Sequence, residues 1–249
     1  MIMRGFTLVG VLASAANLHA TGAIPQEQLQ EAKAAGKRGE FEPLVELARS
    51  GTAVAKEEAA EALSNLAVSN DNKVAIAAAG GIAPLVELAR SGTAVAMEYA
   101  AAALANLVVN ADNDVAIAAA GGITLFVELA RSGTARAKEE AVAALAILAI
   151  GNADNRMAVV AAGGIAPLVE LTRSGTDGAK EKAAGALRNL ALNADNQVAI
   201  AAAGGIAPLV ELTRSGTARA KERAARALRV LAGNTDNRRE MDRLGYQSS

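Results

Sequence analysis

The chain repeats itself about every 41 residues. The segment AAAGGIAPLVELARSG at 77–92 returns at 201–216 with one exchange, Thr213 for Ala89, and altered copies lie between the two. An apolar residue at the same place in each copy gives the register, with spacings of 41, 41, 42 and 41 residues: Phe41, Ile82, Ile123, Ile165 and Ile206. A period of this size predicts a solenoid, because so small a unit buries its apolar face only against its neighbours.

Each copy predicts three helices joined by short turns. The first helix, DNKVAIAAAG at 71–80, begins at an Asp-Asn pair that can cap it and ends at a Gly-Gly turn. The second helix, IAPLVELAR, has a proline in its first turn, where a missing N–H costs nothing, although the third copy has Leu125 there. Glu87 and Arg90 on this helix have the i, i+3 spacing of a surface ion pair, and the spacing recurs in every copy. A threonine N-cap precedes each longer third helix: Thr52, Thr93, Thr134, Thr176 and Thr217.

Composition narrows the chemistry that the chain can perform. Hydrophobic residues make up 52% of the chain, with three Phe, two Tyr and no Trp, so Ala and Leu must fill the interior. The absence of cysteine excludes disulfides and thiolate metal sites, and His19 is the single histidine. No Ser-His-Asp or Cys-His set can be assembled, so we expect no enzyme, metal, cofactor or small-molecule substrate. A net charge of −1 and the lack of aromatic residues among basic ones argue against nucleic-acid binding.

Some columns of the third helix never change from copy to copy. They lie on one helical stripe, which predicts the face packed on neighbouring repeats. The alanine column is Ala59, Ala100, Ala141, Ala183 and Ala224. The first leucine column is Leu63, Leu104, Leu145, Leu187 and Leu228, and the second is Leu66, Leu107, Leu148, Leu190 and Leu231.

Other columns of the third helix change strongly, and their spacing of four, three and four residues places them on one further stripe. In order along the helix they are Val54, Val95, Arg136, Gly178 and Arg219; Glu58, Tyr99, Glu140, Lys182 and Arg223; Glu61, Ala102, Ala143, Gly185 and Arg226; and Asn65, Asn106, Ile147, Asn189 and Val230. A Lys-Glu pair near the helix start, Lys56-Glu57 in the first copy, hardly changes. Variation gathered on one stripe indicates a surface that faces a non-repetitive ligand; a solvated face free to vary is the alternative.

The period, the short–medium–long order of helices, the Gly-rich turn before IAPLVEL and the ALSNLA-type ending of the third helix resemble the armadillo repeat family over roughly 40–240. The resemblance implies an all-α, right-handed α-α superhelix of about five three-helix repeats plus terminal caps. It also implies that the third helices line a concave groove, which holds extended peptide segments of partner proteins.

The resemblance assigns roles to single positions. Asn65, Asn106 and Asn189 stand where the family's ladder of asparagines holds a peptide backbone, and Ile147 and Val230 interrupt that ladder. Tryptophan, which the family's nuclear-import members carry one turn earlier, is missing from this chain. We therefore expect generic peptide binding and not an import-receptor role.

The variable stripe changes charge along the array. Glu58 and Glu61 make its early end acidic, and Arg219, Arg223 and Arg226 make its late end basic. We expect an extended ligand with cationic groups at the first end and carboxylates or phosphates at the second, because arginine binds such anions bidentately. The other candidate residues of the surface are Tyr99, Arg136, Glu140 and Lys182.

The two ends of the chain depart from the repeat. Residues 25–249 predict a single solenoid with a polar first helix at 25–36 and a C-terminal cap at 234–249. The apolar segment at 1–24, with Arg4 near its start, fits a secretory signal and a capping helix equally well, and is too short and interrupted to span a bilayer. A capping helix implies a cytoplasmic or nuclear protein, and a cleaved signal implies the secretory pathway or an organelle.

A scaffold that binds a protein or an extended peptide is the leading interpretation. One alternative is a structural subunit or assembly factor of a larger complex, which uses other surfaces. Another is a consensus-like designed repeat scaffold without a natural ligand, although the irregular residues 1–40 argue against a wholly idealised design. The sequence does not determine the partner or the oligomeric state.

Overall fold

The computed structural model describes residues 26–247, and the N-terminal segment at 1–24 lies outside them. The described part contains sixteen α-helices and no strand, beginning with α2 (Gln26–Lys37). The second helices of the repeats are α3 (Glu42–Ser50), α6 (Ile82–Ser91), α9 (Gly122–Ser132), α12 (Ile165–Ser174) and α15 (Ile206–Ser215). The third helices are α4 (Ala53–Leu66), α7 (Ala94–Leu107), α10 (Ala135–Gly151), α13 (Asp177–Leu190) and α16 (Ala218–Leu231). The first helices are α5 (Asn70–Ala78), α8 (Ala111–Ala119), α11 (Ala153–Ala161), α14 (Ala194–Ala202) and the terminal α17 (Thr235–Arg243).

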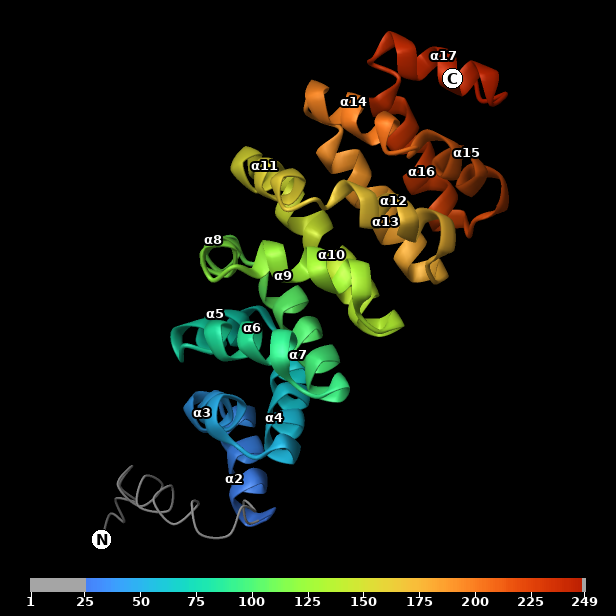
Figure 1. Ribbon diagram of the computed structural model, residues 1–249. Coiled ribbons are helices and arrows are strands. Elements are labelled where there is room, and N and C mark those ends of the chain that lie inside the picture. Colours follow the sequence, from blue (N-terminus) through green and yellow to red (C-terminus); the bar gives the residue numbers. More distant parts are fainter. Residues whose placement is uncertain (1–25, 248–249) are drawn as a thin grey trace, which may run out of the picture.

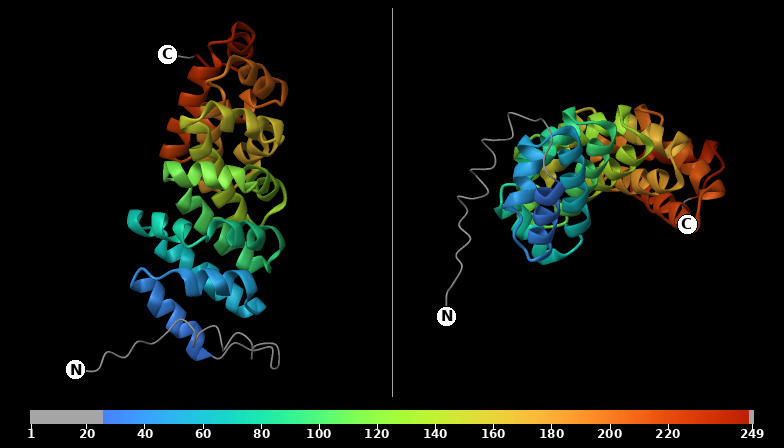
Figure 2. Two further views of the ribbon diagram at one scale, coloured as in Figure 1. Left: turned by 90° about the vertical axis from the view of Figure 1, so that its left-hand side faces the viewer. Right: turned by 90° about the horizontal axis from the view of Figure 1, so that it is seen from below.

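The second and third helices each stack on their counterparts in the next repeat, so the chain forms the predicted all-α repeat superhelix (Figure 1). The third helices contact one another in an unbroken series, and they pack more closely than the first or second helices do. A stack that is packed more closely on one side bends toward that side. The third helices therefore lie on the inner side of the arch that Figure 2 shows from below.

The constant columns of the third helices form the core, as predicted. Every residue of the alanine column and of the first leucine column is fully buried. The second leucine column is equally buried except for Leu66, which is partly exposed. Only α2 stands before Leu66, where a complete repeat precedes each of the other four leucines.

The helix caps agree with the prediction for the third helices and not for the first ones. Each predicted threonine accepts the N–H three residues further on, at 3.1–3.3 Å. The Asp-Asn prediction is wrong: the N-cap of α8 is Asn110, whose Oδ1 accepts from Asp112 N and Asn113 N. Asn113 is buried, and its Nδ2 donates to Leu107 O at 3.2 Å and to Lys73 O at 3.0 Å. Asn113 therefore ties two consecutive repeats together.

The Gly-Gly turns end the first helices as predicted. The first glycine of each pair has a positive φ of 73–79°, a conformation that glycine adopts without a steric penalty: Gly80, Gly121, Gly163 and Gly204. In the third copy, Leu125 is buried at the place of the proline. The inserted Gly151 extends α10 to 17 residues, against 14 for the other third helices.

The predicted Glu–Arg ion pair of the second helices forms in two copies of the described chain, Glu46–Arg49 at 3.0 Å and Glu170–Arg173 at 2.8 Å. In the last copy Arg214 Nη2 donates instead to Leu244 O at 2.7 Å, at the end of α17. The prediction therefore holds for only part of the array, because the arginine can also reach the next repeat.

The array ends in α17, which packs on α14 and α15, and it begins with α2 against α3 and α4. None of the helices in 26–247 is by itself long and apolar enough to cross a membrane. Four pairs of first and second helices reach the required length and composition together, but each pair is bent by 79–88°.

Candidate functional site

The twelve predicted site residues lie on the five third helices, whose common surface we call the third-helix face. The exposed ones are Asn65, Arg136, Arg219, Arg223 and Arg226. The partly buried ones are Glu58, Glu61, Tyr99, Asn106, Glu140 and Lys182. Asn189 is buried, as are Ala102 and Gly185 of the variable stripe. Part of that stripe thus belongs to the contacts between neighbouring third helices.

The asparagine ladder is partly used within the array. Asn106 Nδ2 donates to Ser64 O at 3.2 Å, and Asn189 Nδ2 donates to Ala146 O at 2.9 Å. Each bond joins a third helix to the preceding one. An amide has two N–H donors and a carbonyl acceptor, so the half-buried Asn106 keeps polar atoms for a ligand. Asn65 is exposed, whereas Asn189 is 5% exposed and mainly connects repeats.

The acidic end of the third-helix face is partly neutralised by its neighbours. Glu58 forms an ion pair with Lys33 of α2. Glu61 accepts a hydrogen bond from the Tyr99 hydroxyl at 3.3 Å, and the Arg136 guanidinium lies 4.8 Å from the centre of the Tyr99 ring. A cavity of about 370 Å³ opens beside these residues between α2 and α4. Three of the predicted residues, Glu61, Tyr99 and Arg136, are therefore linked across three repeats.

The basic end is more open. Arg219 and Arg223 are exposed and form no ion pair within the described residues, while Arg226 pairs with Glu222 of the same helix. Gly185 on the preceding helix leaves space in front of Arg223, since a Cβ at that glycine would lie 3.9 Å from Arg223 Cδ. Three arginines in an accessible row can bind carboxylate or phosphate groups.

Comparing the repeat copies in sequence did not identify one set of residues that connects the third helices. Glu57, Glu98 and Glu139 each accept a hydrogen bond from the capping threonine of the next repeat, at 2.5, 2.5 and 2.9 Å. The constancy of this column was the available signal. The column is constant because its glutamates make contacts between repeats. Its constancy therefore does not show that exposed positions outside the variable stripe stay unchanged.

Replacing Glu139 by glutamine is expected to lower the free energy of unfolding at neutral pH. The variant should also lose less of that free energy than wild type as the pH falls. Burial raises the pKa of Glu139, but hydrogen bonds from Lys182 and Thr176 and the Lys182 charge outweigh burial and leave the pKa below its ordinary value. Such a carboxylate stabilises the fold above its unfolded pKa of about 4.3, and this contribution is lost as the pH falls through the lower folded pKa. The gap between wild type and variant should therefore shrink below about pH 4.3.

Urea unfolding at several pH values measures this gap. Glu181→Gln is the matched control, because Glu181 occupies the same place in the next repeat and makes no hydrogen bond or ion pair in the part of the chain that the structure describes. The same pH-dependent gap in both variants would contradict the assignment.

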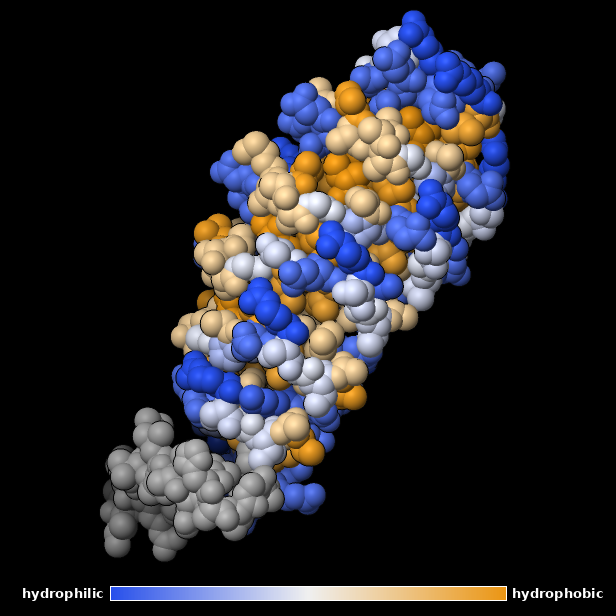
Figure 3. All heavy atoms as spheres, in the orientation of Figure 1, coloured by the Kyte–Doolittle hydropathy of each residue, from blue (hydrophilic) through white to orange (hydrophobic). Residues whose placement is uncertain are grey.

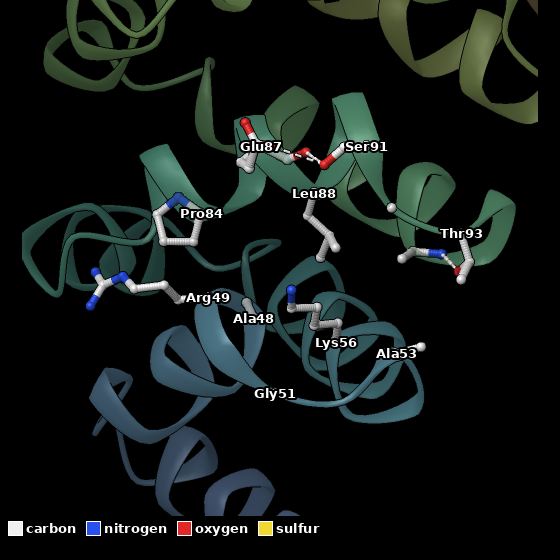
Figure 4. Close-up of a pocket in the computed structure, with 12 residues that line it drawn as sticks. Ala48, Arg49, Gly51, Ala53, Lys56, Pro84, Glu87, Leu88, Ser91 and Thr93 are labelled. Atoms are coloured by element: carbon white, nitrogen blue, oxygen red, sulfur yellow. Dashed lines mark hydrogen bonds between the residues drawn. The ribbon is translucent and has the colours of Figure 1, made fainter. Parts of the chain in front are cut away.

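A further cavity, of about 280 Å³, lies at the junction of the first two repeats (Figure 4). Arg49, Lys56, Pro84 and Glu87 line it from α3, α4 and α6. Ser91 at its rim donates to Glu87 Oε1 at 2.9 Å. This cavity contains none of the predicted site residues, and its volume is at the lower limit of typical ligand pockets.

The three-helix repeats stack so that their third helices form one face. This arrangement is that of a solenoid scaffold. The family of the Armadillo/beta-catenin-like repeat matches the chain at residues 69–109, 152–192 and 193–233. The chain belongs to the armadillo repeat family, which is a generally non-enzymatic family of scaffolds.

Solved structures give the same fold. An engineered protein is 35% identical, with a TM-score of 0.76 over 82% of this chain and 84% of that one. Computationally designed armadillo repeat proteins for modular peptide recognition are 25% identical, with a TM-score of 0.73 over 90% of this chain and 94% of theirs. A designed armadillo repeat protein in complex with the peptide (KR)4 is 25% identical, with a TM-score of 0.72 over 92% and 95%. Among curated proteins no significant match is found.

Proposed function

We propose that this protein is a non-enzymatic scaffold whose third-helix face holds an extended segment of a partner protein. Two solved neighbours were designed for peptide recognition or carry a bound peptide, which supports this kind of ligand. In this chain, Asn65 and Asn106 offer amide groups at the beginning of the face. An amide can donate and accept together, so it suits a peptide main chain of any sequence.

The observation that carries the proposal is the difference in charge between the two ends of the face. α16 presents five exposed basic residues and one acidic one: Arg219, Lys221, Arg223, Arg226 and Arg229, with Glu222. At the other end, Lys33 neutralises Glu58, so the acidic end is weaker than the sequence predicted. We therefore assign the ligand's acidic groups to α16, where charge-assisted bonds to arginine give the stronger contacts.

The change Arg223→Glu with Arg226→Glu is expected to weaken binding of a labelled peptide of alternating Glu and Gly by more than ten-fold at about 0.15 M salt. Each reversal removes an attractive contact and adds a repulsive one within the ~8 Å Debye length. Fluorescence anisotropy measures the affinity. A Lys-Arg repeat peptide should bind the variant more tightly than wild type, because it meets less positive charge there.

The control is Arg238→Glu with Arg239→Glu on α17, which makes the same change in net charge away from the third-helix face. If both double variants weakened peptide binding equally, the effect would come from overall charge. That result would contradict the assignment of the ligand's acidic groups to α16. Unchanged affinity in the α16 variant would contradict the proposal directly.

A consensus-like designed scaffold is the second candidate, and the 35% identity to an engineered protein favours it. Such a scaffold shares the fold and has no natural ligand. The anisotropy experiment separates the two, because a face without a ligand preference would bind neither peptide above the level of a scrambled control.

A further inference from the structure

Exposed apolar side chains gather on a surface that the peptide-binding proposal does not use. Ten large hydrophobic residues are exposed in the described part, and eight of them fall in two columns of the repeat. The column two residues beyond the second leucine column is Val68, Val109, Ile150 and Leu192. The column on the first helix is Val74, Val115, Met157 and Val198. We call these eight residues the first-helix stripe.

The two columns form one continuous strip. Lys73, beside Val74, reaches back with its Nζ to Val68 O at 3.4 Å, so the turn and the first helix lie together. Asn113 Nδ2 of α8 donates to Lys73 O of α5, and Asn155 Nδ2 of α11 donates to Asp114 Oδ1 of α8, so these three first helices are joined in series. Figure 3 shows apolar colours, interrupted by hydrophilic ones, over α8, α11 and α14 along the left-hand edge of the molecule.

The core does not require these side chains. Their exposed fractions are 53–70%, and on α5 the inward positions belong to Lys73 and Ile76. The strip also stops at the last repeat, where Gly233 follows the third helix and Arg239 replaces the valine of the first. Four consecutive repeats thus keep an apolar residue at positions where the fifth has none.

The apolar area is large enough for a weak, specific contact. Eight such side chains, each a little over half exposed, present on the order of 300–600 Å². This equals the largest apolar patch on a typical monomer, and exposed alanines of the same helices, such as Ala116 and Ala158, extend it. Two copies face to face would bury about twice this area, roughly 600–1,200 Å². The upper end of this range reaches the ~1,000–1,200 Å² at which specific interfaces begin.

Charged rows border the strip and set the orientation of a second copy. Exposed aspartates lie at the beginning of the first helices: Asp71, Asp112, Asp154 and Asp195. Arginines of the second helices lie beside the glycine turns at their other end, as Arg90 does next to Gly121 and Arg131 next to Gly163. A two-fold axis along the array brings the aspartates of one copy opposite the arginines of the other. An axis across the array would place aspartate against aspartate, which like-charge repulsion disfavours.

We propose that the first-helix stripe is the interface of a homodimer, in which two copies of this chain lie side by side with their arrays parallel. The contact leaves the third-helix face of both copies free. The dimer therefore presents two peptide-binding faces, although its existence does not depend on peptide binding.

Sedimentation equilibrium of the full chain tests the proposal. Wild type is expected to show a concentration-dependent monomer–dimer equilibrium, and Val109→Glu with Val115→Glu is expected to raise its dissociation constant by at least ten-fold. The matched control is Val54→Glu with Val95→Glu, since these two valines are also exposed but lie on α4 and α7. Both pairs are on the surface, so circular dichroism should show an unchanged fold.

Several results would overturn the dimer. A wild type that stays monomeric at about 100 µM would mean that something else covers the strip, such as residues 1–24 or another protein. If the control pair weakened dimerisation equally, the dimer contact would not lie on the first-helix stripe.

A cysteine at one end of the strip tests the orientation, because the chain contains no other cysteine. In the parallel arrangement Val198 of one copy lies near Val198 of the other, so Val198→Cys should form a disulfide-linked dimer on mild oxidation. Cross-linking only in a mixture of Val198→Cys with Val74→Cys would indicate antiparallel copies and overturn the parallel arrangement.

Discussion

Replacing Leu145 by alanine is expected to lower the free energy of unfolding by about 2–5 kcal/mol. Leu145 is fully buried in α10, at the centre of the array. Its helix contacts α7 on one side and α13 on the other. Because the stability of a repeat array is a sum of repeat and interface contributions, a cavity in the central repeat weakens two interfaces together.

Urea denaturation followed by circular dichroism measures this loss. Val54→Ala is the control, because Val54 is 64% exposed on α4, and its truncation should change the free energy of unfolding by less than about 0.5 kcal/mol. A cost below about 1 kcal/mol for Leu145→Ala would show that the invariant leucine column is not the core of the array.

Replacing Gly122 by alanine is expected to destabilise the protein by about 1–3 kcal/mol or more. A Cβ at this position would lie 2.4 Å from Ile117 Cγ2 and 2.8 Å from Ile117 O. The side-chain methyl can shift, but the backbone oxygen moves only if α8 moves relative to α9. The first and second helices of this repeat would then lose their packing.

Gly185→Ala is the same glycine-to-alanine change, but it is expected to raise the free energy of unfolding. A Cβ at Gly185 would meet only Arg223 Cδ at 3.9 Å, and alanine inside a helix is favoured over glycine by about 0.5–1 kcal/mol. The two variants should therefore shift the urea midpoint in opposite directions. A shift of both in the same direction would contradict the steric explanation for Gly122.

Most of the architecture could be predicted from the sequence because it depends on local rules that each copy obeys. The threonine caps, the left-handed first glycine of each turn and the buried leucine columns follow from interactions within about one repeat. The caps of the first helices were mispredicted because Asp112, Asn113 and Asn110 are all good N-cap residues. The choice among them depends on the burial of Asn113 against Lys73 O, which belongs to the preceding repeat.

The candidate site was predictable as a set of columns but not as a set of accessible groups. Asn65, Asn106 and Asn189 occupy one column, yet the first is exposed and the last is buried. The difference arises because the amides of Asn106 and Asn189 donate to the third helix before them, whereas α2 stands before the helix of Asn65. Likewise, the Lys33 charge beside Glu58 could not be read from the repeat, because it comes from the irregular α2.

The sequence by itself determined the period, the three helices of each repeat, their apolar faces and the charges along the variable stripe, because these depend on residue type and on spacing within one copy. Only the tertiary structure decided which of those polar groups face solvent and which are used between repeats, because each such bond joins residues about 40 positions apart, as Tyr99 joins Glu61. It also showed that Val74 and its equivalents point outward. In sequence they belong to the same apolar run as the buried Ile76, and only the stacking of the first helices distinguishes the two sides.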